Sequence, residues 1–370
     1  MTAPISSRIN SIECLRGISA LLVVCYHYRQ FLNDITPKLG HILFENGRIG
    51  VDIFFVLSGF AIYLSTQAPS EQGVLRFLLR RFFRIVPLAW LLMAVVWLIT
   101  PGLSPLETLK SVLFIPLSPE SAPFFGYNIL PVAWTLTYEL CFYGLFALAL
   151  GVAPRQRGLV VAALVLGMVG LLQWHSGQSL SIDPYQEEIF KTLHLGPLWV
   201  GIFANPLFLE FLCGVLLAWL YLRHASALAK IPVPLRTGAY LFLLAFFISH
   251  FFSGYAMGHG LNRKGLAAIA LFALYLAMHV DPLLAWFNQR FAPGPGGVFQ
   301  FFGQISFSLY LVHGVLPLQI DHTPLLNHLY EHSSGWGKFV LLFSFSVLAA
   351  YVLHVLIERP CHKLGKYLAR

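Results

Sequence analysis

Residues 12–32 read IECLRGISALLVVCYHYRQFL, an apolar block that contains Arg16 and His27. A helix needs about 20 apolar residues to cross the roughly 30 Å hydrocarbon core of a bilayer, so this block is long enough to span a membrane. It continues without a small-residue cleavage site, which indicates a retained helix rather than a secretory signal. Ionisable groups inside a membrane are costly and are typical of functional sites. Arg16 and His27 are therefore the first candidates for function.

Similar apolar blocks recur along the chain and predict an all-α, polytopic integral membrane protein with about ten transmembrane helices. The chain is 57% hydrophobic and only 11% charged, whereas soluble domains carry about 25% charged residues. We expect one transmembrane domain over residues 1–370, without an appended soluble domain. The predicted helices cover residues 12–32, 47–66, 76–100, 131–150, 157–174, 205–223, 235–253, 261–280, 299–320 and 337–357.

The formal charge of +8 lies mostly between the apolar blocks, so it reflects membrane topology and excludes nucleic acid as the expected partner. With the N-terminus inside, the cytoplasmic segments hold about twice as many basic residues as the outer ones, as the positive-inside rule requires. Both termini are therefore expected in the cytoplasm, and the protein in the inner (plasma) membrane. A homo-oligomer stays open.

Two outer loops, at about 101–130 and 175–204, are rich in proline and aromatic residues, and the first contains a predicted short helix at 106–117. They either cover an outward-facing site or are inert. The five cysteines form no CxxC pair, so we expect no disulfide framework and no metal site.

Five of the predicted helices, the first among them, place titratable groups at one depth, roughly 7–12 Å below the outer surface at about 1.5 Å per residue. These groups are His27, Asp52, Glu139, Glu210 and His313. A buried polar network that only fixes helix packing would explain any one of them. Five together favour an outward-facing functional cavity.

The first helix links that layer to the cytoplasmic side. Arg16 and His27 are eleven residues apart, so they share one helix face and are separated by about 16 Å along the axis. Ala20 and Val23 leave a shallow groove between them. A long anionic donor could bind with its phosphates near Arg16 and its reactive end beside His27. For Arg16 alone, anchoring to lipid headgroups explains the charge equally well.

A basic segment precedes the third predicted helix and includes Arg81 and Arg84, with aromatic residues between the arginines. An interfacial helix anchored on anionic lipid has this pattern. A phosphate site also has it, because guanidinium groups match phosphate oxygens. The sequence does not separate these two readings.

The chain resembles the acyltransferase 3 family of membrane acyltransferases, which modify cell-surface glycans and some small molecules. Any one of the matching stretches would be weak, but all occur in family order between residues 13 and 360. They are ECLRG with His27 eleven residues after Arg16, GVDIFFVLSGF (50–60), RRFFRIVP (80–87), WTLTYELCFY (134–143), GQISFSLYLVH (303–313) and ERP (358–360). Leu140 and Thr137 depart slightly from the family pattern.

The resemblance implies O-acyl transfer from an acyl-CoA, most often acetyl-CoA, to a hydroxyl group of a sugar. Arg16, Arg81 and Arg84 would contact the donor phosphates, and His27 would be the general base, since imidazole titrates near neutral pH. Glu139 would orient His27 in the manner of a triad carboxylate. The remaining candidates, for substrate contacts or for supporting the catalytic residues, are Asp52, Ser58, Tyr138, Glu210, Ser306, Tyr310 and His313.

Direct transfer is favoured because no serine or cysteine lies in a recognisable nucleophile motif, although an acyl-histidine or acyl-tyrosine intermediate stays open. The competing class is a proton-coupled transporter or an acyl-group carrier, since carriers also hold intramembrane charges. No inverted repeat supports it. The acceptor and the acyl length are not readable from the sequence.

Overall fold

The computed structural model describes residues 10–34, 36–176, 179–186, 197–228, 230–254, 257–280, 298–319 and 324–370. Within those ranges the regular structure is helical and contains no β-strand, which confirms the all-α prediction there. Parts of the predicted outer loop 175–204, at 177–178 and 187–196, lie outside the described residues.

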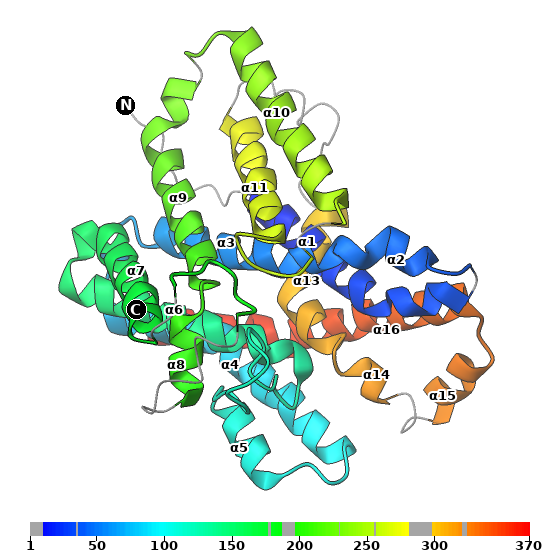
Figure 1. The fold of residues 1–370 in the computed structure, drawn as a ribbon. Helices are drawn as coiled ribbons and strands as arrows, with labels where there is room; N and C mark the ends of the chain where they lie inside the picture. The colour runs from blue at the N-terminus through cyan, green and yellow to red at the C-terminus, as the bar shows by residue number, and fades with distance from the viewer. Residues whose placement is uncertain are drawn as a thin grey trace.

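Each predicted transmembrane range falls on a helix of the structure (Figure 1). These helices are α1 (Asn10–Tyr28), α3 (Ile49–Ser65), α4 (Val74–Ile99), α6 (Trp134–Val152), α7 (Arg157–His175), α9 (Phe208–Leu228), α10 (Val233–Phe252), α11 (Lys264–Val280), α13 (Val298–Val312) and α16 (Gly335–Leu353).

Several predicted ranges extend beyond the α-helix that they contain, two of them close to candidate residues. The first continues past Tyr28 as the 3₁₀ helix η1 (Arg29–Asp34). The ninth breaks after Val312 and resumes as the short helix α14 (Leu316–Gln319). Gly314 and Pro317 lie at this break, and both residue types interrupt a helix. His313 therefore lies just beyond the end of α13 rather than within a helix.

Shorter helices connect the long ones. The helix predicted at 106–117 is observed as α5 (Pro105–Val112). The others are α2 (Leu39–Phe44), α8 (Pro197–Ala204), α15 (Pro324–Glu331) and α17 (Arg359–Leu368), and a π-helical turn (His354–Glu358) joins α16 to α17.

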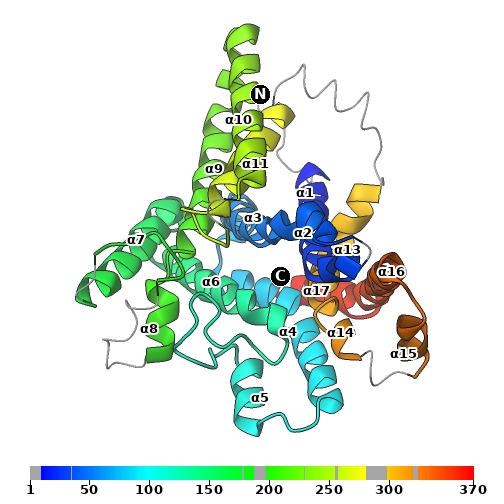
Figure 2. The ribbon, with the colours of Figure 1, turned by 45° about the vertical axis from the view of Figure 1, so that its right-hand side comes forward.

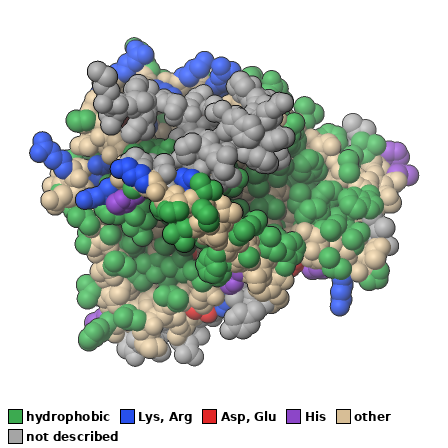
Figure 3. Space-filling model, turned by 90° about the horizontal axis from the view of Figure 1, so that it is seen from above, with side chains coloured by type: hydrophobic (Ala, Val, Ile, Leu, Met, Phe, Trp, Pro, Cys, Tyr) green, Lys and Arg blue, Asp and Glu red, His purple; other side chains and the backbone are tan. Residues whose placement is uncertain are grey.

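Six helical segments of the described residues are long and apolar enough to cross a membrane: Leu39–Ser65, Val74–Ile99, Pro131–Val152, Pro154–His175, Val233–Phe252 and Gly335–Leu368. Many large apolar side chains on them face outward, and α10 buries none of its residues. Figure 3 shows one face of the molecule, on which hydrophobic side chains dominate and lysine and arginine gather near one edge. Such a surface suits lipid as its solvent.

Helix α1 lies between α3 and α13 and packs against both along its length. Helix α3 packs in turn against α9 and α11, and α10 packs on α11 (Figure 1). Helices α4 and α6 lie on the other side of α3 and α13, and α17 packs against α4 (Figure 2). The helix that carries Arg16 and His27 is therefore central in the bundle.

Glycines allow the closest helix crossings around this centre. A Cβ atom at Gly59 of α3 would overlap the backbone carbonyl of Phe211 in α9, and one at Gly214 would overlap that of Val56. A Cβ at Gly303 of α13 would likewise overlap the backbone of α1. Small residues let helix backbones approach closely, which is how helices associate inside a membrane.

We expect Gly59→Ala to lower the thermal unfolding temperature of the detergent-solubilised protein, because the added methyl group forces α3 away from α9. Overpacking of this kind costs about 1–3 kcal/mol. Gly144→Ala in α6 is the matched control, since a Cβ there meets no atom within 4 Å. Equal unfolding temperatures for the two variants would contradict this account of the crossing.

Candidate active site

Two adjoining cavities lie beside α1. The first, here called the arginine cavity, holds about 70 Å³ of free space and is lined by Arg16, Arg81, Arg84, Ser58, Glu139 and Tyr143, among others. The second, the histidine cavity, holds about 360 Å³ and is lined by His27, His259, His313, Arg48, Tyr26 and Trp134, among others. Val51 and Tyr310 line both cavities, so they form part of a wall that the two spaces share, here called the junction.

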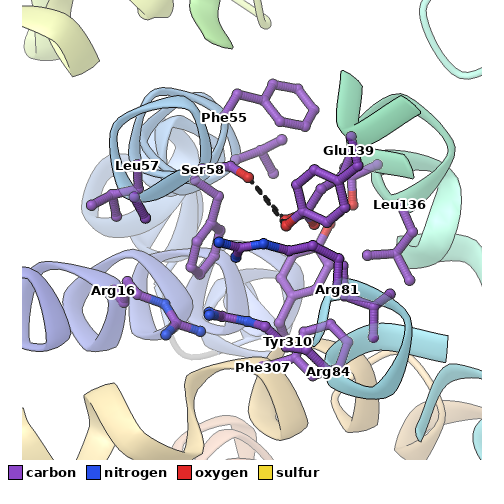
Figure 4. A pocket seen from close by; sticks show the side chains of 16 residues that line it. Arg16, Phe55, Leu57, Ser58, Arg81, Arg84, Leu136, Glu139, Phe307 and Tyr310 are labelled. Carbon is purple, nitrogen blue, oxygen red and sulfur yellow. Dashed lines mark hydrogen bonds between the residues drawn. The ribbon is translucent and has the colours of Figure 1, made fainter. Parts of the chain in front are cut away.

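The arginine cavity carries an excess of positive charge. Figure 4 shows the guanidinium groups of Arg16, Arg81 and Arg84 turned toward the same space. No residue in the described ranges forms a hydrogen bond or ion pair with the side chain of Arg16 or Arg84. Three guanidinium groups share this low-dielectric pocket with one carboxylate, Glu139. The excess of positive charge is suited to bind an anion, and phosphate oxygens match the geometry of guanidinium groups.

Helix α4 directs its arginines to two different sides. Arg81 and Arg84, three residues apart, reach the arginine cavity, because residues at this spacing share a helix face. Arg81 also lies over the rings of Phe77 and Tyr143. Arg80 points away and pairs with Glu71 outside the cavity. In the basic segment, Arg81 and Arg84 therefore form part of the cavity wall, whereas Arg80 forms an ion pair outside it.

Glu139 is the acidic residue of the arginine cavity, and its partners are hydroxyl groups. Ser58 donates a hydrogen bond to it at 3.0 Å, and Tyr143 donates a second, closer one. Glu139 lines the arginine cavity and His27 lines the histidine cavity. Among the described residues no hydrogen bond joins the two, so the role predicted for Glu139, orienting His27, stays a prediction.

His27 is exposed to the histidine cavity at the end of α1. Its Nδ1 lies 2.9 Å from the carbonyl oxygen of Val23 and 3.3 Å from Nε2 of His313. His313 is buried, and its own Nδ1 lies 3.1 Å from the carbonyl oxygen of Leu309. A carbonyl only accepts, so Nδ1 is the protonated nitrogen of both rings. This tautomer leaves Nε2 of His27 as an unprotonated nitrogen with no hydrogen bond from the described residues.

Asp52 is fully buried in α3 and accepts two hydrogen bonds from the loop between α10 and α11. The Nδ1 of His259 lies 3.0 Å from one carboxylate oxygen, and the backbone N–H of Gly260 donates to the other at 2.9 Å. Glu210 of α9 is also fully buried and interacts electrostatically with Asp52. The structure therefore joins two of the predicted residues, Asp52 and Glu210, around an imidazole that faces the histidine cavity.

The loop that carries His259 is held from a second side. The backbone N–H of His259 donates to the hydroxyl of Tyr185, and Arg263 forms an ion pair with Asp183 at 2.9 Å. Burial alone would raise the pKa of Asp183, but the hydrogen bonds from Arg263 and from the backbone of Tyr185 outweigh it and leave that pKa below its usual value. Burial raises the pKa of Tyr185 to about 12, so its hydroxyl stays neutral.

Some predicted residues lie at the cavities and others do not. Ser58 lines the arginine cavity, and Tyr310 lies at the junction with its hydroxyl bound to Thr135 and to the carbonyl of Val132. Tyr138 lines neither cavity, and its hydroxyl donates to the carbonyl of Pro123 in the loop that precedes α6. Ser306 also lines neither, since its hydroxyl donates to its own helix at Gly303.

His259 and Tyr143 are not among the residues predicted from the sequence. His259 lies in the short loop between α10 and α11, outside the apolar blocks on which that prediction rested. The flanking glycines, Gly258 and Gly260, have φ values of 111° and 106°, which other residues rarely adopt, and this Gly-His-Gly pattern was the available signal. Tyr143 lies one helical turn after Glu139, a spacing that places both side chains on one face.

Sequence comparisons with known proteins place the chain in a family. A sequence model of the acyltransferase domain that defines the acyltransferase 3 family matches residues 9–355. The chain is 32% identical over 339 residues to the exopolysaccharide production protein ExoZ of Rhizobium meliloti, covering 89% of this chain and 93% of that protein. It is 25% identical to the acyltransferase MdmB of Streptomyces mycarofaciens, covering 96% and 92%.

A shorter match joins 28% of this chain to 15% of the peptidoglycan O-acetyltransferase OatA of Listeria monocytogenes, at 36% identity over 108 residues. The family match spans every helix that contributes to the two cavities, from α1 to the start of the π-helical turn. The chain is therefore a membrane acyltransferase that belongs to the acyltransferase 3 family.

Proposed function

We propose that the protein transfers an acyl group, most simply acetyl, from acyl-CoA on the cytoplasmic side to a hydroxyl group of a sugar on the outer side. The observation that carries this proposal is the junction at Val51 and Tyr310, where a cationic cavity adjoins a cavity lined by imidazoles. A donor bound by its phosphates in the first could present its thioester to a base in the second.

The proposal that acyl-CoA is the donor rests on the net positive charge of the arginine cavity. Three guanidinium groups face one carboxylate in the arginine cavity, and that carboxylate, Glu139, is already engaged by Ser58 and Tyr143. Several anionic oxygens would balance the remaining charge, as the phosphates of coenzyme A do. Glu139 thus forms part of the wall of the donor cavity.

The base is proposed from the tautomer of His27. Its Nε2 has a free lone pair, and the side chain is exposed to the histidine cavity. A sugar hydroxyl that enters this cavity could pass its proton to Nε2 as the oxygen attacks the thioester carbon. His313 would support His27, because its Nε2 accepts from the same Nδ1–H that binds the carbonyl of Val23.

A glycan acceptor is supported by relatives whose printed names concern exopolysaccharide production and peptidoglycan O-acetylation. Aromatic side chains on the wall of the histidine cavity, among them Tyr26, Phe124 and Trp134, would suit the apolar faces of sugar rings.

We propose further that the chain spans the inner membrane about ten times with both termini in the cytoplasm. Homo-oligomerisation is compatible with this but is not required by it.

We expect His27→Ala to abolish acyl transfer, because the variant removes the proton acceptor while the arginine cavity still binds the donor. The measurement is the alkali-labile ester content of surface polysaccharide in cells that express the variant as the sole copy. His175→Ala, at the exposed end of α7, is the control and should behave as wild type. An active His27→Ala enzyme rules out the assignment of the base.

Arg84→Ala should weaken acetyl-CoA binding about 10- to 100-fold, since a hydrogen bond to a charged group contributes about 1.5–3 kcal/mol. Isothermal titration of the purified protein with acetyl-CoA measures this. Arg80→Ala, one turn away on the same helix, should leave binding unchanged, because Arg80 pairs with Glu71 outside the cavity. Equal affinities for the two variants would favour lipid anchoring as the role of the whole segment.

Free CoA released from labelled acetyl-CoA by the purified protein separates an acyltransferase from a transporter, because a carrier leaves the thioester intact.

The proposed membrane topology is tested by reporter fusions. A fluorescent protein at the C-terminus should fluoresce, and alkaline phosphatase inserted after Pro119 should be active, since each reporter works on one side only. The reverse pattern would place the arginine cavity on the wrong side for cytoplasmic acyl-CoA.

A further inference from the structure

We propose that His259, held by Asp52, is a second catalytic group of the histidine cavity. It stabilises the negative charge that develops on the acyl carbonyl oxygen, while His27 takes the proton from the acceptor hydroxyl. This inference rests on the acyl transfer proposed above and assigns a role that neither the sequence motifs nor the relatives' names give to this residue.

The first support is the pairing of His259 with a buried carboxylate. Asp52 is fully buried and binds Nδ1 of His259 at 3.0 Å. A carboxylate in this position fixes the ring and stabilises its protonated form, as in a Ser-His-Asp triad. Nδ1 is occupied by Asp52, so Nε2 is the nitrogen of His259 that remains for a substrate in the cavity.

The second support is the rigidity of the loop. Gly260 donates its backbone N–H to the other oxygen of Asp52, and Tyr185 binds the backbone of His259. The rings of Trp134 and Phe124 lie 5.6 and 6.3 Å from the imidazole. A charge-stabilising group acts best when its position is set before the reaction, because no reorganisation is then needed.

The third support is the contrast with His27. The nitrogen of His27 that is engaged meets a backbone carbonyl and a second imidazole, and no carboxylate. Arg48, a cation, lines the same cavity. An imidazolium at His259 would have Asp52 as its counter-ion, whereas one at His27 would have none. Because the surroundings of the two imidazoles differ, they suit different roles: His27 that of a base and His259 that of a cation.

Glu210 strengthens this division. Its carboxyl group lies beside Asp52, and two adjacent buried carboxyl groups do not both ionise. The side chain of His259 and the backbone N–H of Gly260 both bond to Asp52, and Glu210 also interacts with Asp52. Asp52 is therefore the carboxyl group on which the contacts of the loop and of Glu210 converge, next to His259.

The proposed step transfers the acyl group from the thioester sulfur to the acceptor oxygen. The acceptor oxygen bonds to the acyl carbon, and its proton moves to Nε2 of His27. The carbonyl oxygen becomes an oxyanion that accepts a hydrogen bond from Nε2–H of His259. The bond between the acyl carbon and sulfur then breaks, and His27 returns the proton to the leaving thiolate. Nε2–H of His259 donates to the oxyanion and keeps its proton throughout, so His259 stabilises charge without net proton transfer.

Two amide substitutions separate this role from simple anchoring of the loop. The amide nitrogen of asparagine replaces Nδ1 of histidine, and that of glutamine replaces Nε2. His259→Asn therefore keeps the contact to Asp52 but loses the group that faces the cavity. His259→Gln keeps a donor toward the cavity but weakens the contact to Asp52. The readouts are the initial rate of ester formation on surface polysaccharide in cells, and acetyl-CoA binding and unfolding temperature of the purified protein.

We expect His259→Asn to lower the rate at least about 100-fold, the loss usual for one oxyanion donor, with acetyl-CoA binding unchanged. His259→Gln should retain at least about ten times more activity than His259→Asn, the difference that about 1.4 kcal/mol makes. Equal loss in both variants, or greater activity in His259→Asn, overturns the proposal and leaves His259 as a loop anchor. A wild-type chain that forms no ester overturns the proposed function as well, which distinguishes the two failures.

Discussion

The burial of charge around α1 is the constraint on which the rest of the structure depends. An ionisable group inside an apolar helix bundle costs several kcal/mol unless a partner or a wet cavity receives it. Arg16 and His27 lie on one helix between α3 and α13, and each opens on a different cavity. The close glycine crossings at Gly50 and Gly303 hold α1 against its neighbours, so the two groups face defined spaces rather than lipid.

The charged groups of those two spaces differ in how they are partnered. The arginine cavity collects cations with few partners, and its carboxylate Glu139 is engaged by hydroxyl groups. The histidine side instead pairs its buried carboxylate, Asp52, with an imidazole. Low dielectric strengthens both arrangements. Unpartnered cations are poised for an anionic ligand, and paired groups are poised for chemistry at a fixed position.

Acidic residues in similar sequence surroundings thus have different contacts in the folded chain. The sequence suggested that Glu139 orients the catalytic imidazole and that Asp52 is secondary. In the structure Asp52 contacts an imidazole, whereas Glu139 is hydrogen-bonded to hydroxyl groups. Depth counted along a straight helix cannot distinguish them, since it ignores how neighbouring helices tilt and rotate. Lys264 illustrates the same point: its buried ammonium group binds three carbonyls at the end of α10.

Local pattern in the sequence determined the helices, because apolar blocks of sufficient length have no alternative to helical hydrogen bonding in a membrane. It also determined that Arg16 and His27 share a face, since that follows from 3.6 residues per turn, and that the chain resembles its family. The tertiary structure alone decided which charges meet. The contacts of His27 with His313 and of Asp52 with His259 join residues more than 200 positions apart, and helix packing and loop conformation, not periodicity, bring such residues together.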